Sequence, residues 1–119
     1  MPFYRGMRMS NRILYLGAKN VFFSAINFVM EKKNYELFQF ESWGDCLGQL
    51  EDLDVFYIFV DCDTCEDALA SIVKDSQIPV LCFTAGSEAE KSVKIVKKPV
   101  SINDFEKEID KVLKGQLDG

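Results

Sequence analysis

Hydrophobic and polar residues follow two different patterns along this chain. Apolar runs typical of buried strands occur in three segments, 12–17, 55–60 and 78–83, and segment 92–96 is predicted to be a further strand. Segment 35–40 alternates polar and apolar residues with a period of two, which predicts a strand near a sheet edge. Helical spacing of apolar residues predicts four helices: 18–33, a short one after Ser42, one after Thr64 and one after Ser101 that Gly115 ends.

Strands and helices therefore alternate along the chain, which favours an α/β fold with a parallel sheet covered on both faces. A regular alternation would place one more helix, the fourth, between the strand that ends near Thr84 and the last strand. Because Lys98 follows Thr84 by only 14 positions, this helix is predicted to be missing or a single turn. We expect one domain over residues 11–115. Residues 1–10 are expected to be a disordered leader or expression remnant, and residues 116–119 a tail or the start of a linker.

Composition narrows the possible functions of the chain. A net charge of −5 argues against a nucleic-acid surface on this domain. No apolar run approaches the roughly 20 residues that span a bilayer, and no apolar signal segment follows the first residues. Four cysteines without such a signal indicate reduced thiols in the cytoplasm. The absence of histidine removes the commonest general base and metal ligand, which disfavours an enzyme.

Three polar residues stand where predicted strands end. Asp61 follows the third strand, Thr84 follows the fourth, and Lys98 with Pro99 follows the fifth. In doubly wound folds, functional residues gather at these carboxyl ends. The arrangement resembles the receiver domain of two-component response regulators, the CheY-like family. The resemblance covers residues 11–115 and implies a flavodoxin-like fold, with five parallel strands in the order 2-1-3-4-5.

The resemblance also implies roles for these residues. Asp61 lies at the position that accepts a phosphoryl group from a histidine kinase. Thr84 and Lys98 lie at the positions whose hydroxyl and ammonium groups contact the phosphoryl oxygens. Such transfer works by positioning and charge neutralisation around a divalent cation.

The metal pocket departs from the family pattern. Receivers carry an acidic pair after the first strand to hold Mg²⁺, whereas this chain reads Gly17-Ala18-Lys19. Asp61 and Asp63 remain only as weak metal candidates, so we expect no metal and no cofactor. The resulting hypothesis is a pseudo-receiver in phosphorelay signalling, similar to atypical receivers of transcription activators that also lose the acidic pair. It would regulate an output module or a protein partner without ordinary Mg²⁺-dependent phosphorylation.

Two alternatives to this hypothesis stay open. The first is a conventional receiver that is phosphorylated at Asp61 with Mg²⁺ as cofactor. The second is a thiol-redox protein, because Cys62-Asp-Thr-Cys65 follows a strand in the manner of a thioredoxin C-x-x-C. Cys46 and Cys82 are expected to be small buried apolar residues.

Association with other proteins is a further expectation. The last helix carries charges of both signs around its apolar stripe, including Glu106, Asp110 and Lys111. Such a surface suits a two-fold interface, so a homodimer through this helix is predicted. Phe22, Phe23 and Phe28 on the first helix are expected to lie in the core.

Overall fold

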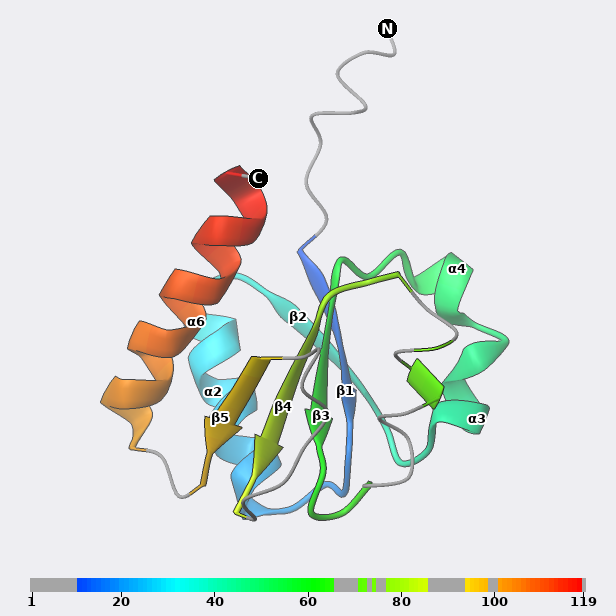
Figure 1. Ribbon diagram of the computed structural model, residues 1–119, viewed down its shortest axis with the longest axis horizontal. Helices are drawn as coiled ribbons and strands as arrows, with labels where there is room; N and C mark the ends of the chain where they lie inside the picture. The colour runs from blue at the N-terminus through cyan, green and yellow to red at the C-terminus, as the bar shows by residue number, and fades with distance from the viewer. Residues whose placement is uncertain are drawn as a thin grey trace, which may run out of the picture.

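The computed structural model describes residues 11–65, 71–72, 74, 77–85, 94–98 and 101–118. Its centre is a five-stranded parallel sheet in the order β2-β1-β3-β4-β5, which confirms the predicted order and fold class (Figure 1). The strands are β1 (Arg12–Leu16), β2 (Glu36–Phe40), β3 (Tyr57–Asp61), β4 (Val80–Thr84) and β5 (Lys94–Lys97).

Helices cover both faces of the sheet, as parallel strands require. In Figure 1, α2 and α6 lie on one face, and α3 and α4 lie on the other. Their bounds are α2 (Val21–Lys32), α3 (Trp43–Leu47), α4 (Leu50–Leu53) and α6 (Ile102–Asp118). Side-chain caps begin three of them: Asn20 accepts the Phe23 N–H, Ser42 that of Asp45, and Ser101 that of Asp104. Within the described residues, no helix is both long and apolar enough to cross a bilayer.

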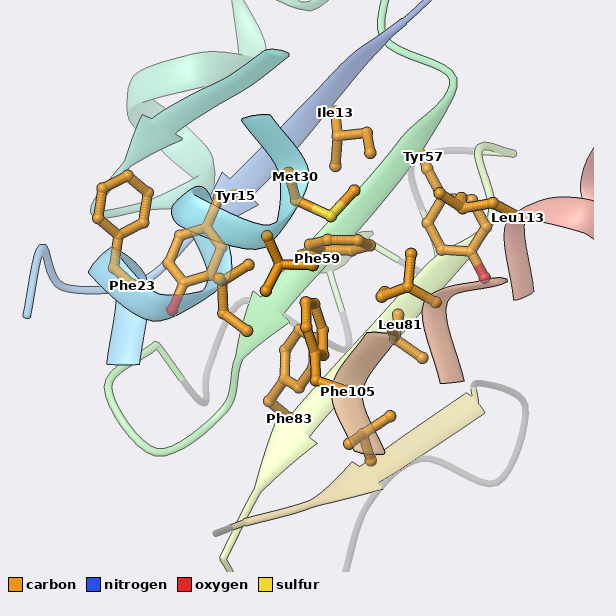
Figure 2. Packing of buried hydrophobic residues seen from close by; sticks show 14 residues of the cluster. Ile13, Tyr15, Phe23, Met30, Tyr57, Phe59, Leu81, Phe83, Phe105 and Leu113 are labelled. Carbon is orange, nitrogen blue, oxygen red and sulfur yellow. The ribbon is translucent and has the colours of Figure 1, made fainter. Parts of the chain in front are cut away.

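The sheet separates two apolar clusters. The cluster beneath α2 and α6 is rich in aromatic rings: Phe83 packs against Phe59 and Phe105 with ring centroids 5.6 and 5.7 Å apart (Figure 2). The cluster on the α3 face combines strand residues with Trp43, Cys46 and Cys82. Alternate side chains of each central strand feed the two clusters, so β3 and β4 are buried along their whole length.

Several predictions about helix bounds and about burial were wrong. The short helix predicted after Ser42 divides into α3 and α4 around Gly48. Helix α6 continues past Gly115 to Asp118, into the predicted tail. Phe28 is 55% exposed, because the inward face of α2 is formed by its neighbours Ile26, Val29 and Met30. The predicted leader, most of the helix after Thr64 and the shortened fourth helix lie outside the described residues.

Parallel strands bring all their carboxyl ends to one edge of the sheet, the lower edge in Figure 1. The segments that follow β1, β3, β4 and β5 therefore meet there. This edge holds Gly17, Asp61, Thr84 and Lys98.

Candidate functional site

Asp61 is the last residue of β3 and the only fully buried acid among the described residues. Its Oδ1 accepts a hydrogen bond from the Lys98 Nζ at 2.7 Å and another from the Asp63 backbone N–H at 3.1 Å. Its Oδ2 is buried and has no hydrogen-bond partner in the described part of the chain. A buried carboxylate is stable only when a cation compensates it, so the site depends on Lys98.

Lys98 is fixed from several directions. Its backbone N–H donates to the Thr84 carbonyl at 2.9 Å, extending the ladder between β4 and β5. Its ammonium then contacts Asp61 and also Asp63, whose Oδ2 lies 3.2 Å away. The same Nζ stands 4.2 Å from the centroid of the Phe22 ring, in cation–π geometry. Because only 15% of its side chain is exposed, the Lys98 ammonium is held inside the site beside Asp61.

Asp63 turns inward and joins this network. Its Oδ1 accepts the Thr84 hydroxyl at 3.0 Å, and its Oδ2 accepts the Ala85 N–H at 3.0 Å. Although partial burial alone would raise the pKa of Asp63, the Ala85 N–H, Lys98 and Thr84 together lower it. Asp63 is therefore an ionised partner of Lys98 and Thr84.

These residues do not fit a Mg²⁺ ion. Magnesium needs several oxygen ligands in octahedral geometry, and the oxygens of Asp61 and Asp63 face an ammonium group instead. The described residues contain no group of three or more side chains that could hold a metal.

Gly17 follows β1 at a position that has no room for a side chain. A Cβ atom at this position would lie 2.6 Å from the Asp61 Cβ and 3.1 Å from the Thr64 Oγ1. Its φ of +156° is also rare for residues with side chains. The next residue, Ala18, donates its N–H to the Thr64 Oγ1 at 3.0 Å. Direct contact between the segments that follow β1 and β3 thus occupies the space that a side chain at position 17 would need.

Sequence reasoning missed Tyr15 and Phe22. The Tyr15 hydroxyl is buried without a hydrogen-bond partner among the described residues, and its ring packs against Phe23 at 4.9 Å (Figure 2). Burial, and then the charge of Asp61, raise the pKa of Tyr15. The available signals were the positions of the two residues: Tyr15 shares a strand face with Gly17, and Phe22 lies in the first turn of α2 at the same sheet edge.

The cysteines are arranged differently from the C-x-x-C prediction. The Cys62 Sγ lies 2.6 Å from the Cys82 Sγ, while the Cys65 thiol donates weakly to the Glu41 carbonyl at 3.5 Å. Cys46 and Cys82 are buried, as predicted. The sulfur of Cys62 therefore contacts the sulfur of Cys82, which lies in the neighbouring strand β4.

Solved structures share this architecture. A two-component response regulator from Clostridium difficile matches with a TM-score of 0.71 and 13% identity, over 89% of this chain and 97% of that one. A response regulator receiver domain protein from Bacillus halodurans C-125 matches at 0.69 and 20% identity, over 87% and 97%. The BeF3-activated conformation of SdrG from Pseudomonas melonis Fr1 matches at 0.68 and 14% identity, over 87% and 96%.

Neither a known protein-family description nor a curated protein matches the sequence. At these identities the structural likeness establishes the fold. The chain has the CheY-like, flavodoxin-like architecture of receiver domains.

Proposed function

We propose that the chain is an atypical receiver domain of a two-component-type response regulator. It regulates an output module or a separate protein by contacts in the cytoplasm, contacts neither nucleic acid nor membrane, and catalyses no reaction. It does so without ordinary Mg²⁺-dependent phosphorylation of Asp61. The observation that carries the proposal is the fully buried Asp61 carboxylate, already neutralised by Lys98 at 2.7 Å.

The geometry disfavours phosphoryl transfer to Asp61. A carboxylate oxygen must reach the phosphorus in line with the leaving group, while cations neutralise the equatorial oxygens. Here both Asp61 oxygens are buried, and the ammonium that would neutralise the phosphoryl group is shared with Asp63. A phosphoryl group adds close to two negative charges, which would stand beside the Asp63 carboxylate without a metal to balance them.

Phosphodonor treatment tests this proposal. The domain is incubated with acetyl phosphate and Mg²⁺, and separately with beryllium fluoride and Mg²⁺, then examined by intact mass and amide NMR shifts. We expect no stoichiometric mass increase and no shifts at Asp63 or Ala85. A conventional receiver treated in parallel confirms that the reagents are active.

The opposite result has a clear meaning. A stoichiometric phosphoryl adduct that disappears in Asp61→Asn would refute the proposal. It would establish the alternative of a conventional receiver with Mg²⁺ as cofactor.

The partner surface proposed here is formed by β5 and α6. A groove between them is lined by charged residues of both signs and by the exposed Ile95, and Ile102, the first residue of α6, is also exposed. In this groove Lys111 pairs with Glu108 at 3.6 Å. Weak self-association through this face would bury the two isoleucines and exchange such ion pairs between copies.

Sedimentation over a concentration series tests the self-association. The Lys111→Glu variant should weaken the dimer. A strict monomer at high concentration would refute self-association and favour contact with a different protein.

A further inference from the structure

Cys62 directly follows β3, Cys82 lies in the adjacent strand β4, and their sulfur atoms are in contact. In the register of β3 and β4, Val60 pairs with Cys82 and Asp61 pairs with Phe83, so Cys62 lies two positions beyond the partner of Cys82. Both side chains lie on the α3 face of the sheet, opposite to Asp61. The two sulfur atoms are 2.6 Å apart, so a few tenths of an ångström separate them from a disulfide bond of about 2.05 Å.

The two thiols differ in environment. Cys82 is completely buried among apolar residues, whereas Cys62 is partly exposed and can meet a small oxidant from solvent. The hydrogen bond from Cys62 lowers the pKa of Cys82, and the same bond and burial raise the pKa of Cys62. The two sulfurs are in hydrogen-bond contact, so a proton can pass between them. Once the pair has lost one proton to solvent, transfer of the other to Cys82 leaves the negative charge on the sulfur of the partly exposed Cys62.

We propose that Cys62 and Cys82 form a peroxide-sensitive dithiol that closes to a disulfide between β3 and β4. The Cys62 thiolate attacks one peroxide oxygen, the O–O bond breaks, and Cys62 becomes a sulfenic acid with release of hydroxide. Hydroxide takes the proton of Cys82 and becomes water. The Cys82 thiolate then attacks the Cys62 sulfur and displaces a second hydroxide, which solvent protonates. Two thiols and one peroxide thus give one disulfide and two waters.

The other cysteines are placed for different contacts. The Cys65 thiol donates to the Glu41 carbonyl at 3.5 Å, and the Cys46 thiol donates to the Trp43 carbonyl at 3.4 Å. Burial also raises the pKa of Cys46 to about 11, which keeps it protonated. Cys65 is a matched control for Cys62, because both are partly buried after β3 and pack against the same cluster.

The disulfide would act on the Asp61 site through the backbone. The Cys62 N–H donates to the Phe83 carbonyl at 2.9 Å, and the adjacent Asp63 holds Thr84 and Ala85. A covalent link between β3 and β4 would fix these two strand ends against each other. This redox device is independent of whether Asp61 accepts phosphate.

Peptide mapping tests the proposal on the full chain. The protein is treated with hydrogen peroxide, alkylated and digested with trypsin without reduction. Trypsin cleaves after Lys33, Lys74 and Lys91, so Cys82 is the sole cysteine of peptide 75–91 and the other three lie on peptide 34–74. We expect two of the four thiols to be lost and the two peptides to be linked until a reductant separates them. The link should persist in Cys65→Ala and vanish in Cys62→Ala.

Three outcomes would overturn the proposal. These are four intact thiols at a peroxide dose that oxidises free glutathione, a disulfide confined to peptide 34–74, or a link that persists in Cys62→Ala. Cys82→Ala gives a further check, provided circular dichroism shows that this core variant folds. The wild-type map and the Cys65→Ala control decide the matter without it.

Discussion

Replacement of Lys98 by methionine removes the ammonium from Asp61 and keeps an unbranched side chain of similar length. The buried carboxylate then retains only the Asp63 N–H as a hydrogen-bond donor among the described residues. The apolar stem can still contact the Phe22 ring, so most of the packing survives. The substitution therefore isolates the contribution of the charge.

The expected loss of stability is large. Removing one partner of a buried ion pair destabilises a protein by about 3–5 kcal/mol, because the remaining charge stays desolvated. Loss of the cation–π contact adds about 0.5–1 kcal/mol. The second ion pair, with the partly exposed Asp63, contributes less than about 1 kcal/mol. We expect a total near 5 kcal/mol, a substantial part of the roughly 5–15 kcal/mol that holds a domain folded.

Urea unfolding followed by fluorescence measures this loss. Trp43 is the single tryptophan and is buried against the α3 face of the sheet, so its emission reports global unfolding. With a slope of about 2 kcal/mol per molar urea, the midpoint should fall by about 2.5 M.

Companion variants decide whether the reasoning holds. Asp61→Asn removes the buried charge and leaves Lys98 paired with Asp63, so it should cost only about 1–2 kcal/mol. The Lys98→Met/Asp61→Asn double variant should be more stable than Lys98→Met alone. Lys97→Met, on an exposed neighbour, should stay within about 0.5 kcal/mol of wild type. A Lys98→Met loss below about 1 kcal/mol, or strict additivity in the double variant, would refute a desolvated Asp61 pair.

Three further substitutions probe the same site by thermal or urea unfolding. Gly17→Ala should destabilise the protein by about 2–4 kcal/mol, because the new Cβ would stand 2.6 Å from the Asp61 Cβ. The control Gly48→Ala, which has open space around it, should be neutral or slightly stabilising. Equal effects of the two substitutions would contradict the steric argument. Tyr15→Phe removes a buried hydroxyl that has no partner among the described residues, so stability should stay level or rise by up to about 1 kcal/mol, and a clear loss would reveal a hidden hydrogen bond. Because the folded state lowers the pKa of Asp63, its stabilisation is present above the usual aspartate value near 3.9 and disappears as the pH falls through the folded value. Asp63→Asn should therefore be weaker than wild type by less than about 1 kcal/mol at neutral pH and equal to it near pH 2; a gap that widens in acid would reverse the assigned sign.

Local patterns in the sequence determined the fold and part of the site. Continuous apolar runs marked the strands, because only side chains buried on both faces of a parallel sheet can all be apolar. Asp61, Thr84 and Lys98 were found because parallel strands bring their carboxyl ends to one edge. The prediction that no metal binds rests on residue type alone, because the Gly17-Ala18-Lys19 segment has no carboxylate.

The tertiary structure decided which of these residues touch. Cys65 is closer to Cys62 in sequence than Cys82 is, yet strand register and side-chain alternation bring the Cys82 sulfur within 2.6 Å. The exposure of Phe28 depends on how α2 is rotated against the sheet, a rotation that helical spacing leaves undetermined. The inward turn of Asp63 depends on hydrogen-bond donors from the end of β4, which lie far from it along the chain. Sequence periodicity indicates which side chains of a helix or strand share a face. Which of those side chains touch across two elements is decided by how the elements pack against each other in a close-packed interior.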